Sequence, residues 1–116
     1  MHYINVTEPN LESLSRSIAN WFLDKFIPDF ELGLDIIPLS FGSDEAMGWT
    51  LQLNIDEYEI EINKDLEEKE YITTLIHELI HVWQHVNGYQ CEDEAYKMES
   101  HLTEQYVTVH KLAHAS

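Results

Sequence analysis

The sequence predicts a single α+β domain over residues 1–116, made of an N-terminal helix, a three-stranded mostly antiparallel sheet, a long helix and a C-terminal helix. Three observations favour this class. Apolar residues recur at helical spacing near both ends of the chain, and central segments alternate apolar with polar residues. Prolines and glycines fall between these stretches. With 116 residues, of which 44% are apolar, the chain can build one hydrophobic core.

The first helix and the first strand are each expected on one side of Pro28. The helix is expected to begin with Asn10 as its N-cap, because apolar residues follow at intervals of three and four, and to end near Pro28. The strand is expected over Leu34–Phe41, which is rich in strand-forming residues. Pro38 cannot donate a ladder hydrogen bond, so it indicates an edge position or a bulge.

Two half-buried strands are expected next, because apolar and polar residues alternate over Trp49–Ile55 and Tyr58–Ile62. The short connection between them predicts an antiparallel hairpin. The polar positions of the second strand are all glutamates, and we expect them to form a solvated outer face: Glu57, Glu59 and Glu61.

Two helices are expected after this hairpin. Asp65 and Glu68 have the spacing of a capping box, which predicts the start of a long helix, and Asn87-Gly88 predicts its end. The last helix is expected to run from Glu92 toward the C-terminus, because apolar residues again recur at helical spacing.

The charge of the chain narrows its expected partners. It holds 22 acidic residues against six Lys and Arg, a formal net charge of -16. Such a charge repels phosphate backbones and anionic lipid, so we expect no direct nucleic-acid binding and no membrane partner, and a preference for basic substrates. The single cysteine, Cys91, excludes an internal disulfide framework and a Cys-rich zinc site. Without a membrane-spanning apolar run or a secretory signal pattern, the expected location is the cytoplasm.

The long helix contains the pattern H-E-x-x-H, formed by His77, Glu78 and His81. Two histidines four positions apart lie on one helical face, so both imidazoles can reach one Zn²⁺. The glutamate beside the first can hold and deprotonate a metal-bound water. These residues predict a zinc site with Glu78 as the general base.

The start of the last helix offers two candidates for a third zinc ligand, Glu92 and Glu99, which share one helical face. If this helix returns antiparallel to the long one, Glu99 comes level with the histidines. Glu92 reaches them only if residues 89–91 are extended. His85 continues the series of histidines, but three ligands in line cannot surround a tetrahedral ion, so we interpret it as a residue at the rim or behind the ligands. Tyr96 is a candidate hydrogen-bond donor to a developing oxyanion.

The stretch Thr74–Gln84 resembles the active-site helix of zincin metallopeptidases, in particular SprT-like and small gluzincin-like peptidases of a type common in bacteriophages. Glu92-Asp93-Glu94-Ala95-Tyr96 is similar to the gluzincin segment whose first Glu is the third ligand, except that Tyr96 replaces an acid or amide. This resemblance favours Glu92 as the third ligand. It implies a minimal zincin-like core, a Zn²⁺ cofactor and hydrolysis of peptide bonds in a peptide or protein substrate, in the host cytoplasm for a phage protein.

The resemblance also implies a cleft between the edge strand of the sheet and the active-site helix, where an extended peptide binds by strand addition. The alternative function is a non-catalytic acidic interaction protein, such as a nucleic-acid mimic, with a structural or vestigial zinc site. The net charge and the strand glutamates motivate that alternative.

Overall fold

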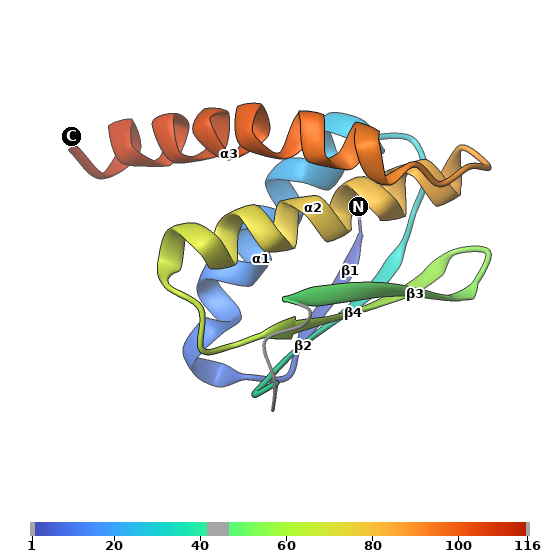
Figure 1. Ribbon diagram of the computed structural model, residues 1–116, viewed down its shortest axis with the longest axis horizontal. Coiled ribbons are helices and arrows are strands. Elements are labelled where there is room, and N and C mark those ends of the chain that lie inside the picture. The colour runs from blue at the N-terminus through green and yellow to red at the C-terminus, as the bar shows by residue number, and fades with distance from the viewer. Residues whose placement is uncertain (1, 42–46, 116) are drawn as a thin grey trace.

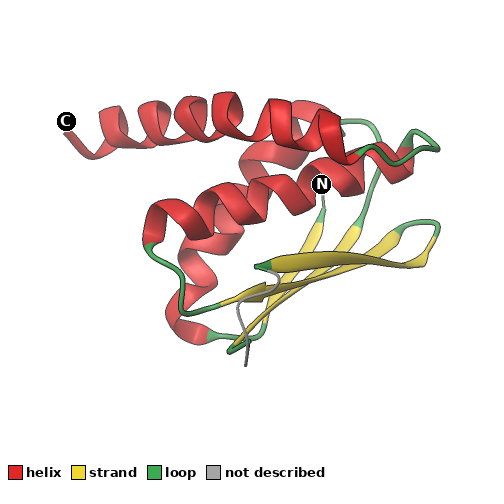
Figure 2. Cartoon of the chain, in the orientation of Figure 1, coloured by secondary structure: helices red, strands yellow, loops and turns green. Residues whose placement is uncertain are grey.

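The computed structural model describes residues 2–41 and 47–115, with side chains up to residue 110. A layer of helices covers one face of a sheet (Figures 1 and 2). This arrangement confirms the α+β class. The elements in chain order are β1 (Tyr3–Val6), α1 (Pro9–Phe26), β2 (Gly33–Leu39), β3 (Gly48–Asn54), β4 (Glu57–Asn63), α2 (Glu68–Val86) and α3 (Glu92–Ala115).

The sheet has four strands in the order β1-β2-β4-β3 and is mixed, so the prediction of three mostly antiparallel strands is wrong. β1 pairs parallel with β2, β2 pairs parallel with β4, and only the β3–β4 hairpin is antiparallel. The hairpin confirms the sequence prediction. β1 has only four residues, too few for an alternating pattern to be recognised.

Pro38 lies on an interior strand, contrary to the expected edge position. β1 pairs with β2 only as far as Val6 opposite Ile36, so Pro38 lies beyond the end of β1. At this position Pro38 is paired only with Ile62 of β4. The missing N–H of Pro38 therefore falls where β2 has only one partner strand, which is the local equivalent of an edge.

The starts of the first two long helices also differ from prediction. Glu8, not Asn10, is the N-cap of α1, and Pro9 occupies the first turn, where its missing N–H costs no hydrogen bond. α2 begins at Glu68 without a side-chain cap, so the predicted capping box does not form. Asp65 instead accepts a hydrogen bond of 2.9 Å from Ser40 Oγ. The predicted helix ends are close to those observed, at Phe26 and Val86.

Helix α2 lies between the sheet and α3, and it also contacts α1 (Figure 1). This position explains why its buried residues extend around much of the helix, from Tyr71 to Gln84. The same burial encloses four polar side chains of α2: His77, Glu78, His81 and Gln84. A polar group buried in this way needs hydrogen-bond partners or a bound ion.

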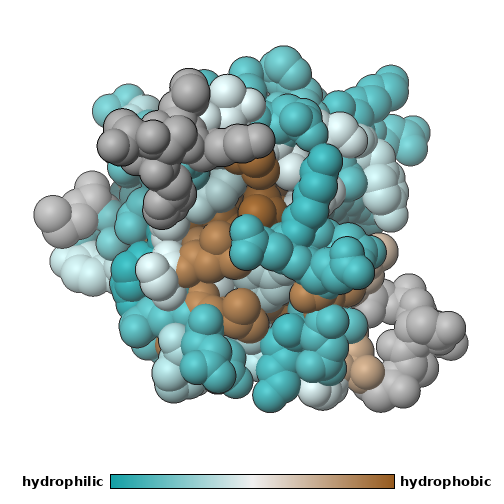
Figure 3. Space-filling model, turned by 90° about the vertical axis from the view of Figure 1, so that its left-hand side faces the viewer, coloured by the Kyte–Doolittle hydropathy of each residue, from teal (hydrophilic) through white to brown (hydrophobic). Residues whose placement is uncertain are grey.

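Figure 3 shows one end of the molecule, where a patch of apolar residues is exposed within a largely hydrophilic surface. Where α1 and α3 meet the start of α2, a hollow of about 560 Å³ has Leu14, Ile72 and Val107 among its lining residues. Ser17 Oγ lies 2.9 Å from the hydroxyl of Tyr106 across the contact. No helix in the described chain is long and apolar enough to cross a membrane.

The apolar residues of β3 point to solvent, contrary to the expectation of a half-buried strand. Trp49, Leu51 and Leu53 are 42%, 45% and 54% exposed. Thr50 lies between them on the other side of the strand and contacts α2. The predicted alternation is therefore correct in its period, but its apolar side faces away from the helices.

Candidate metal centre

Helix α2 carries two candidate metal ligands, His77 and His81, on one face. Residues four apart on a helix lie about one turn apart on the same side, and here the two ring centroids are 4.9 Å apart. Both side chains are buried, which is uncommon for histidine unless it has polar partners. The sequence spacing therefore brings both imidazoles to one place.

The third candidate ligand, Glu92, is the first residue of α3. Its Oε1 lies 2.6 Å from His77 Nε2 and 3.0 Å from His81 Nε2. One ligand atom from each of the three residues lies within 4.8 Å of the other two. Tetrahedral zinc holds its ligand atoms about 3.4 Å apart, so small side-chain shifts would accommodate the ion.

Glu99, the other candidate for the third ligand, lies behind His77. Its Oε1 is 2.7 Å from His77 Nδ1, the ring nitrogen that faces away from Glu92. An ionised carboxylate only accepts hydrogen bonds, so His77 donates from Nδ1. Such a bond orients a metal-binding imidazole and leaves Nε2 for the metal.

Gln84 supports His81 in the same way. It is fully buried, and its Oε1 accepts hydrogen bonds from His81 Nδ1 at 2.9 Å and from the backbone N–H of Cys91 at 3.1 Å. Its Nε2 donates to the backbone oxygen of Cys91 at 2.9 Å and to Glu94 Oε1 at 2.8 Å. The two backbone groups have fixed roles, so they fix the amide orientation and place the proton of His81 on Nδ1.

These supporting bonds determine the character of the three ligand atoms. A neutral imidazole that donates from Nδ1 presents a lone pair at Nε2. Two such nitrogens and the Glu92 carboxylate therefore converge as three acceptors, an arrangement that a cation stabilises. Two histidines and a glutamate are also a ligand set that zinc uses in catalytic sites. The residues present thus fit zinc.

Glu78, the candidate general base, is buried beside the ligands and contacts the edge strand. Thr50 Oγ1 on β3 donates a hydrogen bond of 2.7 Å to Glu78 Oε1. Burial raises the pKa of Glu78, while the hydrogen bond from the Thr50 hydroxyl opposes the rise. A raised pKa suits a carboxylate that accepts a proton and releases it again near neutral pH.

Gly48 permits the close approach of β3 to α2. A Cβ atom at this position would lie 3.0 Å from the backbone oxygen of Glu61, 3.3 Å from Thr74 Cγ2 and 3.5 Å from Glu78 Cγ. A larger residue would therefore move the strand or the base. The contact between Thr50 and Glu78 depends on this spacing.

Tyr96 and His85 occupy different parts of the surroundings. The Tyr96 ring lies 4.8 Å from the His77 ring, and its side chain is largely exposed, so it forms a wall of the site. His85 lies farther along α2, where its Nε2 is 3.3 Å from Gln90 Oε1. Among the described residues, the hydrogen bonds that support the ligand histidines come from Glu99 and Gln84.

Two residues of the site were not anticipated from the sequence, Gln84 and Thr50. Gln84 follows His81 by three positions and so lies on the same buried face, where an uncharged polar residue is itself a signal. Thr50 occupies a polar position of an alternating strand, which indicates only that it lies opposite the apolar side. Its contact with Glu78 depends on how the sheet packs against α2.

No protein-family model matches the chain, and neither a curated protein nor a solved structure matches it. The function of the site must therefore be inferred from its chemistry.

Proposed function

We propose that the protein is a zinc-dependent metalloendopeptidase in which His77, His81 and Glu92 hold the metal and Glu78 is the general base. The observation that carries this proposal is the convergence of two Nε2 atoms and Glu92 Oε1, with both Nδ1 atoms already engaged as donors. A buried carboxylate next to such a centre is what hydrolysis by an activated water requires. The H-E-x-x-H resemblance supports the same reaction.

The protein residues have distinct parts in the proposed reaction. Zinc, when bound, would supply an activated water and polarise the substrate carbonyl. Glu78 takes a proton from the attacking water and passes it to the leaving amine, a role that its raised pKa favours. Thr50 keeps the carboxylate in position on the side of the edge strand. Tyr96, beside His77, is placed to donate a hydrogen bond to the oxyanion.

The substrate is proposed to lie along β3. This strand is at the edge of the sheet and contacts α2, so an extended peptide that pairs with it passes close to Glu78. The formal charge of -16 favours peptides that carry lysine or arginine.

Zinc content and peptide cleavage of matched variants test this function. We expect the purified protein to bind one zinc ion and to cleave an unstructured protein substrate such as casein. Glu78→Gln should keep the zinc and reduce cleavage by at least about 100-fold, since general base catalysis contributes about 10²- to 10⁴-fold. Glu70→Gln, the same change at an exposed position on α2, is the control and should retain full activity. Full activity in Glu78→Gln, or a wild-type protein that binds no zinc, would refute the proposal.

A further inference from the structure

One face of the sheet is covered by the helices, and no described helix or strand covers the other (Figure 1). On β4 the apolar residues Tyr58, Ile60 and Ile62 are buried. The alternate residues therefore point to the uncovered face: Glu57, Glu59 and Glu61. We call this surface, together with the outward residues of the neighbouring strands, the outer face.

The outer face has an apolar row next to its glutamates. Trp49 and Leu51 of β3 lie directly opposite Glu61 and Glu59 of β4, so all four side chains share one side of the sheet. Trp49 and Leu51 are nearly half exposed, and the Trp49 indole N–H donates a hydrogen bond to Glu61. A purely solvated face does not need this contiguous apolar row, whereas a docking surface does.

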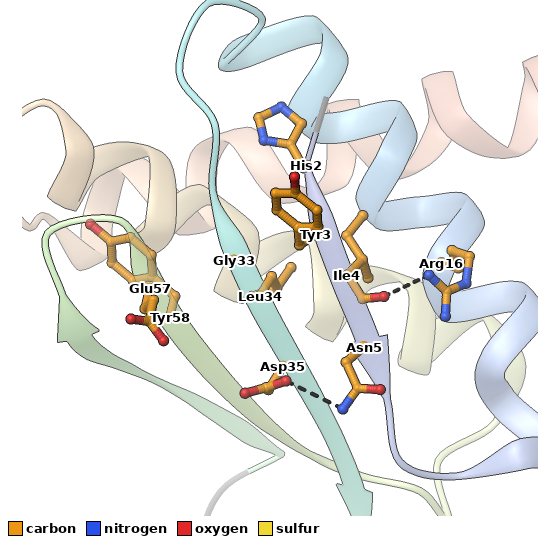
Figure 4. A pocket seen from close by; sticks show the side chains of 10 residues that line it. All are labelled: His2, Tyr3, Ile4, Asn5, Arg16, Gly33, Leu34, Asp35, Glu57 and Tyr58. Carbon is orange, nitrogen blue, oxygen red and sulfur yellow. Dashed lines mark hydrogen bonds between the residues drawn. The ribbon is translucent and has the colours of Figure 1, made fainter.

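A hollow lies at the other side of the glutamate row (Figure 4). Tyr3, Gly33 and Glu57 are in register across β1, β2 and β4, and Gly33 contributes no side chain between the other two. The hollow has a volume of about 390 Å³, and the carboxylates of Asp35 and Glu57 are on its wall. Asn5 donates a hydrogen bond of 3.3 Å to Asp35. This space is large enough for a long side chain, and its carboxylates favour a cationic one.

The charge of the outer face selects its partner. The sequence has no Lys or Arg between Lys25 and Lys64, a stretch that includes β2, β3 and β4, and it has none in β1. Arg16 lines the hollow but is engaged with Glu12 and the backbone oxygen of Ile4. Phosphate backbones are repelled by these carboxylates, and a second copy of the chain brings the same negative charge.

We propose that the outer face binds a polypeptide segment in which lysine or arginine residues accompany apolar ones. Apolar side chains of this segment cover Trp49 and Leu51. Neighbouring strands lie about 4.8 Å apart, so a cationic side chain above β3 reaches the carboxylates of Glu59 and Glu61 on β4. An arginine over the Trp49 indole also gains a cation–π contact.

This surface lies on the opposite side of β3 from Glu78, which Thr50 contacts. A segment bound there is therefore outside the cleavage site but close to the strand along which a substrate would lie. In this respect the inference rests on the proposed peptidase function, because the outer face would hold basic protein substrates through a second contact. The binding itself requires neither zinc nor catalysis.

The test uses the Glu78→Gln variant, so that bound peptides remain intact, and two fluorescein-labelled 12-residue peptides. One alternates leucine with lysine and the other alternates leucine with glutamate, and binding is followed by fluorescence anisotropy at 0.15 M salt. We expect the lysine peptide to bind and the glutamate peptide not to bind. Adding Glu59→Lys and Glu61→Lys should lower the affinity for the lysine peptide by about tenfold or more and allow the glutamate peptide to bind.

The matched control adds Glu67→Lys and Glu70→Lys instead, which changes the net charge equally at the exposed start of α2. This control should bind the lysine peptide within about twofold of Glu78→Gln alone. Equal weakening in both charge variants, or no binding of the lysine peptide, overturns the proposal. If the variant with Glu59→Lys and Glu61→Lys does not fold, Leu51→Lys tests the same surface and should lower the affinity for the lysine peptide. Unchanged affinity in Leu51→Lys then overturns the proposal.

The outcome is separable from that of the peptidase proposal. Peptide binding in Glu78→Gln does not depend on hydrolysis, and repeating it with a chelator removes any contribution of zinc. Sedimentation velocity of each variant shows whether the protein forms a dimer, which is the result expected if a second copy of the chain occupies the outer face. A dimer that Glu59→Lys and Glu61→Lys disrupt, without any peptide binding, overturns the assignment of a basic polypeptide.

Discussion

Two matched substitutions test which glutamate of α3 is the third zinc ligand. Glu92 and Glu99 stand seven residues apart on α3 and contact opposite nitrogens of the same imidazole, His77. Changing each to glutamine removes one negative charge and keeps the size of the side chain. Of these two glutamates, only Glu92 is expected to contact the metal, so the two variants should differ strongly in zinc affinity.

The size of each effect follows from these contacts. A glutamine at position 99 still offers an oxygen to His77 Nδ1, and only the charge of the acceptor is lost. Supporting groups of this kind contribute about 10- to 100-fold to metal affinity, and we expect the lower end, about tenfold or 1.4 kcal/mol. A glutamine at position 92 removes the only charged ligand. We therefore expect a loss above about 100-fold, or 2.7 kcal/mol.

Competition with a chromophoric zinc chelator at constant pH measures both affinities. A thermal melt at fixed free zinc gives an independent measure, because a ligand that binds only the folded state raises its stability in proportion to the logarithm of its affinity. Glu104→Gln, on the exposed surface of α3, controls for the loss of a charge. If Glu99→Gln loses more zinc affinity than Glu92→Gln, Glu99 is the ligand and the assignment is wrong.

Three further predictions concern the residues around the site and in the core. Gln84→Leu leaves two buried donors, His81 Nδ1 and the backbone N–H of Cys91, without partners, so we expect about 2–4 kcal/mol less unfolding free energy in urea and about 10- to 100-fold weaker zinc binding. Thr50→Val removes the hydrogen bond that lowers the pKa of Glu78, so the acid limb of kcat/KM should move to higher pH while zinc content is unchanged. Burial raises the pKa of Tyr71 above its unfolded value, so its contribution to stability is present below about pH 10 and is lost as pH rises through the folded pKa. Tyr71→Phe should therefore lose less unfolding free energy than the wild type between pH 9 and pH 11.

The parts of the site that lie on one helix could be predicted from the sequence. His77, Glu78 and His81 obtain their relative positions from helical geometry alone, and local apolar periodicity is enough to predict the helix. The same reasoning predicted α1, α3 and the β3–β4 hairpin, whose contacts are close in sequence. Elements that depend on partners distant in sequence were harder to predict, as shown by β1 and by the parallel pairing of β2 with β4.

The choice between Glu92 and Glu99 could not be made from helix geometry, because it depends on the loop between α2 and α3. An antiparallel return of ideal helices favours Glu99. The observed loop turns at Gly88, with a φ of 86°, and the amide of Gln84 holds the backbone of Cys91 through two hydrogen bonds. These contacts bring the first residue of α3 back to the histidines, which no periodic pattern encodes.

Gln84 thus links two requirements of the proposed site that are usually met by separate residues. Its oxygen sets the proton on His81 Nδ1, and the same amide positions the residue before Glu92. Because all four hydrogen bonds of this buried amide are made, a change in the α2–α3 loop cannot occur without also disturbing His81. A domain of 116 residues has few layers in which to place supporting groups. Helix α2, enclosed by the sheet, α1 and α3, provides two of the three proposed ligands, the proposed base and part of their support from a single segment of the chain.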